Sequence, residues 1–204
     1  EVPWTNQDFS GGMGLREQMP GIINRYYYAS NVDTRIPLRP MGGPALTTHT
    51  LTGSAGTVRA MAVMKIVSTW TFFVGVGRNV FSSTDGVTFS LSKDLGASRV
   101  VTSMVVYQGD QTVPGLFVGV ETGQKYWFYD GTTWTEHATL EGGHFVALED
   151  ELWRSYKSAN DWFVAKSTDG GATATWAAGI QVGDRATAIT EMIPYDDRSY
   201  VFKE

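Results

Sequence analysis

The chain has 204 residues, 42% of them hydrophobic and 18% charged, so it can bury a core and is unlike a disordered chain. A net charge of −5 is poorly suited to phosphate backbones, and no apolar run reaches about 18 residues. We therefore expect no nucleic-acid partner and no membrane span, and the absence of cysteine excludes disulfides.

The first 50 residues are expected to form an extended N-terminal arm. Three prolines between residues 35 and 44 exclude a central strand there, and residues 16–31 have room for one short helix. The arm has too few core residues to fold alone, so we expect it to be a docking or assembly segment. Aromatic residues and arginine are enriched at protein interfaces, and the interface candidates are Phe9, Arg16, Tyr26, Tyr27 and Tyr28.

Three turn-like segments punctuate the rest of the chain. Each pairs an aspartate with a glycine: Asp85 with Gly86, Asp130 with Gly131, and Asp169 with Gly171. An aspartate can accept hydrogen bonds from N–H groups just downstream, and glycine adopts the positive φ of a tight hairpin. The aspartates lie 45 and 39 residues apart, so we interpret them as one turn of an internal repeat.

Two other markers keep the same step. The sequence Phe-Val-Gly-Val at residues 73–76 recurs at 117–120, which is 44 residues later. Residues 58–64 align with 101–107 at a step of 43, and 189–195 follow after a further 88. Because these markers recur at a common spacing along the chain, they predict a repeat of about 40–45 residues, the period of a four-stranded propeller blade.

Each repeat contains four short segments rich in Val, Thr and aromatic residues, which is typical of strands. We predict strands at residues 58–65, 70–76, 79–83 and 88–91, then 100–107, 115–120, 126–129 and 133–136, then 144–149, 151–156, 162–166 and 175–178. The density of glycine and β-branched residues excludes a helical fold.

The repeat also predicts the domain organisation. After the arm at 1–50, the blades occupy 51–204, at about 58–98, 99–142, 143–184 and, in part, 185–204. About three and a half blades cannot close a ring, so further sequence, other chains or an open solenoid-like array must be considered. Residues 45–51 are a candidate outer strand for ring closure. Because the chain starts at Glu1 and ends within a predicted strand, we expect a fragment or a processed piece.

The turns resemble the Asp-box, Ser/Thr-x-Asp-x-Gly-x-x-Trp/Phe, of sialidases and many other β-propellers. Asp169 with Gly171 fits best, although Trp176 comes two places late. The glycine after Asp85 comes one place early, and Asp130 lacks the preceding Ser or Thr. The resemblance implies an all-β propeller with four-stranded blades, in which the box is a folding element distant from any catalytic centre.

Sialidases also offer an enzymatic alternative. They carry an upstream Phe/Tyr-Arg-Ile-Pro whose arginine binds the substrate carboxylate, and residues 34–37, Thr-Arg-Ile-Pro, are similar to it. The chemistry needs more arginines, a Tyr–Glu pair and an acid. The residues of matching type are Arg35, Arg59, Arg99, Arg154, Arg185, Tyr107, Tyr195 and Glu191. Since only Arg35 lies in a sequence context like that of the family, we assign no catalytic residue.

Other chemistry is less favoured by the sequence. His137 and His144 lack a metal-ligand spacing, and the acidic turn at 149–151 lacks that of a calcium loop, so we expect no metal and no cofactor. A carbohydrate- or receptor-binding propeller, with a host-surface glycan as partner, stays an alternative. The tryptophans that could stack on sugars, but whose places in strands favour packing, are Trp70, Trp127, Trp134, Trp153, Trp162 and Trp176.

The arm carries a second resemblance. Residues 8–16 (Asp-Phe-Ser-Gly-Gly-Met-x-x-Arg), 31–33 (Asn-Val-Asp) and the Arg/Pro-rich 35–44 are similar to N-terminal segments of tail or tail-tip proteins of tailed bacteriophages. This resemblance implies a non-enzymatic virion protein, assembled in the host cytoplasm, whose arm docks on other virion proteins or on copies of itself.

Overall fold

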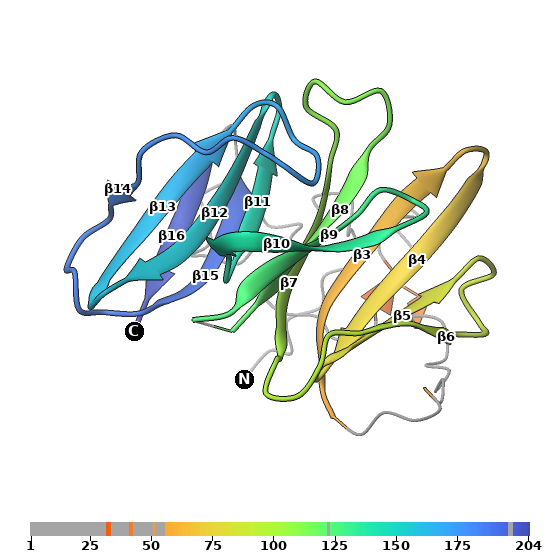
Figure 1. Ribbon diagram of the computed structural model, residues 1–204. Coiled ribbons are helices and arrows are strands. Elements are labelled where there is room, and N and C mark those ends of the chain that lie inside the picture. The colour runs from red at the N-terminus through yellow and green to blue at the C-terminus, as the bar shows by residue number, and fades with distance from the viewer. Residues whose placement is uncertain (1–31, 34–40, 43–50, 52–55, 122, 196–197) are drawn as a thin grey trace, which may run out of the picture. The chain divides into compact units, whose positions relative to one another are not determined.

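The computed structural model describes residues 32–33, 41–42, 51, 56–121, 123–195 and 198–204, and these contain strands and no helix (Figure 1). The chain divides into two compact units, Glu1–Thr48 and His49–Glu204. In the first unit, β1 (Val32–Asp33) pairs antiparallel with β2 (Met41–Gly42), a ladder that the sequence did not predict.

Several expectations lie outside the described residues. These are the short helix within 16–31, residues 45–50 of the candidate outer strand at 45–51, Arg35, and the interface candidates Phe9, Arg16, Tyr26, Tyr27 and Tyr28.

The second unit consists of antiparallel meanders, in which each strand pairs with the next one in the chain. Sheet 1 contains β3 (Val58–Ile66), β4 (Thr69–Val76), β5 (Asn79–Ser83) and β6 (Ser90–Asp94). Sheet 2 contains β7 (Val101–Tyr107), β8 (Gly115–Val120), β9 (Lys125–Tyr129) and β10 (Trp134–Glu141). Sheet 3 contains β11 (Phe145–Leu148), β12 (Glu151–Ser158), β13 (Asp161–Ser167) and β14 (Ile180–Gln181). Sheet 4 has two strands, β15 (Ile189–Tyr195) and β16 (Arg198–Lys203).

The all-β class and the four strands per repeat are confirmed, but the last strand of sheet 3 was predicted too early. It lies at Ile180–Gln181 rather than at 175–178. Two side chains explain the delay. The carboxylate of Asp169 accepts the Thr175 N–H, and the Trp176 indole donates to the Tyr126 hydroxyl of sheet 2 at 3.1 Å. The chain therefore joins the ladder only after this tryptophan.

The first strands of successive sheets lie side by side. Strand β3 packs beside β7, β7 beside β11, and β11 beside β15, so the sheets form a row whose inner edge is made of first strands (Figure 1). Ser103 links two of these strands, because its Oγ donates to Gly143 O at 3.1 Å and accepts the Phe145 N–H at 3.0 Å.

A bulge near the start of the inner strands accounts for the repeat markers. Arg59 and Thr102 are the extra residues in β3 and β7, opposite Gly75 and Gly119 on the second strands. These glycines are required by close approach. A Cβ on Gly75 would lie 2.6 Å from a methyl of Val101, and one on Gly119 would lie 2.0 Å from a backbone carbonyl. The Phe-Val-Gly-Val marker thus records where neighbouring sheets come closest.

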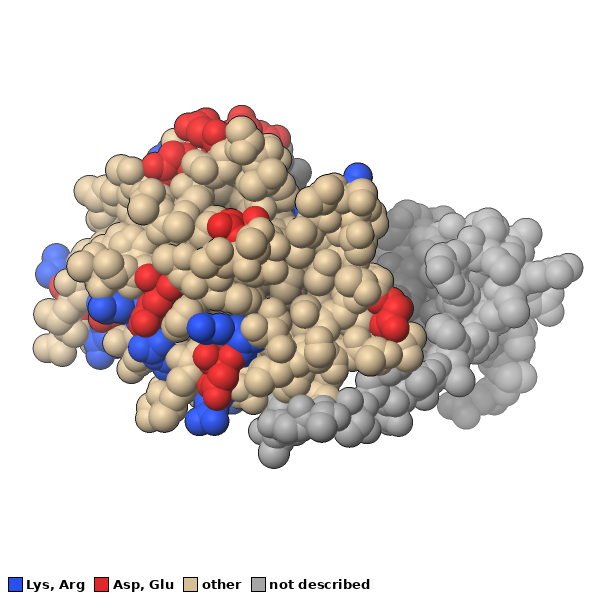
Figure 2. Space-filling view, turned by 45° about the vertical axis from the view of Figure 1, so that its right-hand side comes forward, with Lys and Arg blue, Asp and Glu red and all other residues tan. Residues whose placement is uncertain are grey.

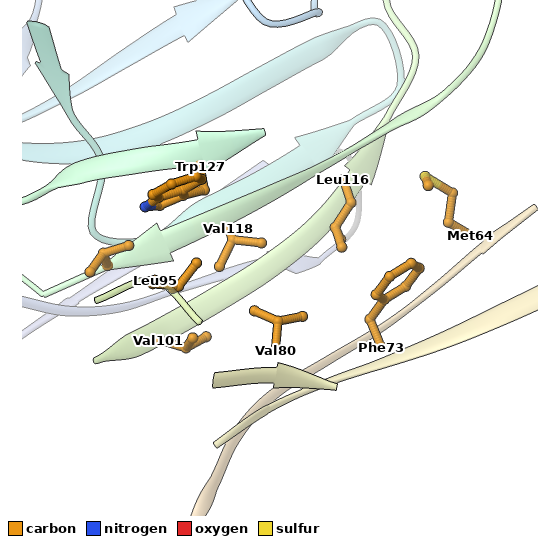
Figure 3. Close-up of a cluster of buried hydrophobic side chains, with 9 residues drawn as sticks. Met64, Phe73, Val80, Leu95, Val101, Leu116, Val118 and Trp127 are labelled. Carbon is orange, nitrogen blue, oxygen red and sulfur yellow. The ribbon is translucent and has the colours of Figure 1, made fainter. Parts of the chain in front are cut away.

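The core is divided among the junctions between sheets. The junction of sheets 1 and 2 is shown in Figure 3, and its buried side chains are Met64, Phe73, Val80, Leu95, Val101, Leu116, Val118, Val120 and Trp127. Aromatic residues fill the next junction, where Phe117 contacts Phe145 at 5.7 Å between ring centroids. Sheets 3 and 4 meet through residues that include Trp162, Ile189 and Met192. A sheet within the row therefore buries both faces.

Candidate functional site

The connecting loops of each sheet lie at the two ends of its strands. In a four-stranded meander, the connections after the first and third strands lie at one end, and those after the second and fourth at the other. The three Asp–Gly segments each connect a third strand to a fourth strand, so all three lie at the first end, which we call the Asp-turn end.

The first turn is organised by Asp85. Its Oδ1 accepts the N–H groups of Val87 and Thr88, each at 2.8 Å, and the Ser83 hydroxyl at 2.7 Å. The bonds from the Thr88 and Val87 backbone, followed by that from Ser83, hold the pKa of Asp85 well below its usual range. Gly86 follows with φ of 71°, which glycine adopts without strain.

Asp130 repeats this pattern in sheet 2 with fewer partners. Its Oδ1 accepts the N–H of Thr133 at 2.6 Å and that of Thr132 at 2.7 Å, and these bonds lower its pKa. Gly131 has φ of 97°. Phe128 stands where the first turn has Ser83, so this position offers the Asp130 carboxylate no hydroxyl.

Asp169 closes a wider turn in sheet 3. Its carboxylate accepts the hydroxyl of the buried Ser167 at 2.5 Å and the N–H of Thr175 at 2.9 and 3.0 Å. Burial alone would raise the pKa of Asp169, but the bonds from Ser167 and Thr175 outweigh it and lower the pKa. Gly170 and Gly171 both have positive φ, 61° and 81°.

All three carboxylates are therefore used by their own turns. Each accepts the N–H groups that the turn would otherwise leave without partners, and each is ionised at neutral pH. In the first and third turns the serine two residues before the aspartate adds a side-chain bond. This arrangement stabilises hairpins and leaves these carboxylates poorly suited to acid–base catalysis.

A groove of about 650 Å³ lies at the Asp-turn end between the loops of sheets 2 and 3. Tyr107 lines it, and its hydroxyl lies 2.6 Å from Asp150 O and 3.1 Å from Thr168 O. Burial and the nearby Asp150 charge raise the pKa of this tyrosine. Tyr107 therefore ties two loops together, a role unlike that of the sialidase nucleophile for which its residue type made it a candidate.

The opposite end has a smaller hollow of about 240 Å³ between sheets 2 and 3, lined by Thr102, Glu121, Gly143, His144 and Trp162. Burial lowers the pKa of His144, while the Glu191 charge opposes this shift, so the imidazole is neutral at pH 7. The sequence did not reveal this hollow, because its residues are far apart in the chain and share no motif.

Three of the arginines of matching type for a sialidase, Arg99, Arg154 and Arg185, each have a separate partner. Arg99 pairs with Glu136 at 2.7 Å, and Arg185 pairs with Asp161 at 3.3 Å. Arg154 is only 3% exposed, and its guanidinium donates to the Glu141 carbonyl.

Arg154 is the most unusual charged residue of the described chain. Its guanidinium lies 4.5 Å from the Tyr156 ring centroid and 4.7 Å from that of Trp176. Burial lowers the pKa of Arg154, and the nearby charges of Tyr126, Tyr156 and Glu141 oppose this shift. The side chain thus links the Asp169 hairpin to the centre of sheet 3 through cation–π contacts.

Most of the tryptophans that could have bound sugars serve packing. Trp127 and Trp162 are buried, and Trp134 stacks on Tyr129 with ring centroids 4.6 Å apart. Trp153 donates to Glu151 at 3.0 Å, whereas Trp70 is exposed on the outer face of sheet 1.

His137 also has a local role. Its Nδ1 accepts the N–H groups of Thr139 at 3.3 Å and Leu140 at 3.0 Å, at the irregularity in β10. Within the described part of the chain, no group of three or more His, Cys, Asp or Glu residues could hold a metal ion. The same residues include no helix long and apolar enough to cross a membrane.

Comparisons with known proteins add little to this geometry. The chain matches no protein-family model, and no curated protein matches it. Among solved structures it is similar to the exo-β-1,3-galactanase from Phanerochaete chrysosporium with β-1,3-galactotriose, at 13% identity and a TM-score of 0.33. The match covers 77% of this chain and 59% of the galactanase chain, so the chain spans less than two thirds of that enzyme's length.

Proposed function

We propose that this chain is a non-enzymatic structural component of a phage virion, of the tail or associated with it. It is built on an incomplete β-propeller scaffold with an N-terminal docking arm. The propeller assignment is supported by four-stranded meanders whose first strands lie side by side, each with an Asp–Gly turn between its third and fourth strands.

One observation carries the assembly function. On the outer face of sheet 1, Val74, Val76 and Phe81 form a buried cluster with Leu51 and Phe89. Around this cluster the face presents exposed apolar side chains, namely Met61, Val63, Trp70, Phe72 and Leu91. We call this set the leading face. Exposed apolar surface gathered on one face of a sheet is typical of a site of protein contact. Figure 2 shows charged side chains of mixed sign in small groups separated by wide uncharged surface, which also suits protein contact better than a polyanion.

The Asp turns support a structural role as well. A catalytic carboxylate needs to be free for substrate, whereas Asp85, Asp130 and Asp169 each accept bonds from their own hairpin. The arginines Arg99, Arg154 and Arg185 likewise have partners of their own. The virion assignment itself comes from the similarity of the arm to tail proteins.

The proposal is tested by the protein composition of purified virions. Virions from the source of this sequence would be purified on a density gradient, washed in high salt and digested for peptide mass spectrometry, with immunogold labelling against residues 51–204. Peptides of this chain at a fixed ratio to a capsid protein, and label at the tail, are expected. Absence of the chain from washed particles would contradict the proposal.

A further inference from the structure

The hollow between sheets 2 and 3 lies where two neighbouring inner strands carry the same irregularity. In β7 the extra residue of the bulge is Thr102. At the start of β11, Gly143 and His144 together face Ser155, because the Gly143 N–H donates to Ser155 O at 2.9 Å and the Ser155 N–H donates to His144 O at 2.8 Å. A bulge redirects the side chains next to it and is common beside binding sites. Thr102, Gly143 and His144 all line the hollow.

The polar groups of the hollow differ from the Asp-turn carboxylates in how they are bonded. Each Asp-turn carboxylate accepts N–H groups of its own hairpin. Among the described residues, by contrast, no hydrogen bond or ion pair is found for the Glu121 carboxylate or for the imidazole of His144. The Thr102 hydroxyl donates to Gly143 O and retains its capacity to accept. The hollow therefore presents side chains that can bond to a ligand.

The charges around the hollow favour a neutral ligand. Glu121 lines it, and the charge of Glu191 acts on His144, which is neutral at pH 7. Two carboxylates beside a neutral imidazole repel an anion. The described part of the chain groups no three side chains of the kind that hold a metal ion. An organic ammonium group would use only acceptors, which leaves the imidazole N–H without a partner.

We propose that this hollow binds one neutral sugar unit, which contacts Glu121, His144 and Trp162. The hydroxyls of a sugar both donate and accept, so they can donate to the Glu121 carboxylate and exchange bonds with the imidazole, which offers one donor and one acceptor. The indole of Trp162 lines the same hollow and offers an apolar surface to the C–H groups of the ring. A volume of about 240 Å³ has room for a single ring. This site goes beyond the proposed assembly function and does not depend on it.

Binding would be measured on the isotope-labelled 204-residue chain by titration with neutral methyl glycosides, those of glucose, galactose, mannose and N-acetylglucosamine, while the amide chemical shifts are followed by NMR. A single sugar unit has few atoms to contribute, so a Kd in the millimolar range is expected for at least one of them. The amides that should shift are those of Thr102, Glu121, Gly143 and His144.

Two substitutions test the contacts separately. Glu121→Gln removes the charge of an exposed side chain and keeps its size, and His144→Leu removes both ring nitrogens. Each should weaken sugar binding at least about tenfold. The control Asp110→Asn neutralises an exposed carboxylate at the Asp-turn end and should bind sugar as the unchanged chain does. Thermal melts would verify that each variant is folded.

Three results would overturn the inference. They are the absence of shifts at the hollow with all of these glycosides, sugar binding that is unchanged in either folded variant, and tighter binding of a charged probe than of every neutral sugar. The charged probes are the methyl glycoside of sialic acid, an anion, and N-acetyl-lysine methylamide, a cation.

The proposed function fails separately. A chain that binds sugar in the hollow but is absent from virions contradicts only the virion role, and a virion chain that binds none of these sugars contradicts only the sugar site.

Discussion

The Asp169 turn offers the sharpest test of how the hairpins are held. Replacing Asp169 with Ala removes the acceptor of the Ser167 hydroxyl and of the Thr175 N–H. Ser167 is buried, so its hydroxyl would lose its partner away from water, whereas the Thr175 N–H is exposed and can bind water instead. The serine bond should therefore dominate the loss.

The magnitude follows from these two bonds. Leaving a buried hydroxyl without a partner costs about 1–3 kcal/mol, and an exposed bond to a charged group adds a smaller amount. We expect Asp169→Ala to lower the free energy of unfolding by about 2 kcal/mol. For a chain of this size that corresponds to a fall in Tm of about 4–8 °C. Asp169→Asn keeps one acceptor oxygen and should lose about half as much.

The assay is differential scanning calorimetry at pH 7. The matched control is Asp161→Ala in the same sheet, which breaks only the solvent-exposed pair with Arg185 and should cost less than about 1 kcal/mol. If Asp169→Ala melted at the same temperature as this control, the assignment of the carboxylate as the organiser of the turn would be wrong.

Four further outcomes are expected. Acid should destabilise the fold, because the pKa values of Asp85, Asp130 and Asp169 are lower in the folded state than in the unfolded state. The stabilisation from these carboxylates is present above about pH 4 and is lost as the pH falls. A Tm that did not drop between about pH 5 and pH 3 would contradict this account. Gly119→Ala should lower the free energy of unfolding, measured in urea, by about 3 kcal/mol, since the new Cβ would lie 2.0 Å from a backbone carbonyl. A loss below about 1 kcal/mol would mean that the sheets can move apart. Arg154→Ala should lower the free energy of unfolding by about 3 kcal/mol and Arg154→Met by about 1 kcal/mol, because methionine restores the apolar packing between the Tyr156 and Trp176 rings. Equal losses would show that the charge of Arg154 matters more than its packing. Fluorogenic sialosides should not be turned over, and a measurable rate abolished by an alanine at residue 35 would support the enzymatic alternative.

Much of the second unit could be predicted from the sequence. The Asp–Gly spacing and the Phe-Val-Gly-Val marker are local signals, and each reflects a local cause: a carboxylate that binds downstream N–H groups, and a glycine opposite a bulge. Strand order followed because successive strands of a meander pair with their neighbours.

Long-range packing could not be predicted in the same way. Trp176 delayed the last strand of sheet 3 because it reached Tyr126 in another sheet, 50 residues away in the chain. The burial of Arg154 beneath that tryptophan had the same cause, since residue type alone suggested an exposed or catalytic arginine. The hollow around His144 likewise depends on how sheets 2 and 3 meet, which no single repeat encodes.

The most direct test of the assembly role is the native mass of the chain in its source material, measured by native mass spectrometry together with negative-stain microscopy. The account predicts a symmetric particle in which several copies of the chain occur with other virion proteins and the leading face of sheet 1 is covered. A free, soluble, single-copy species with that face exposed to solvent would contradict it.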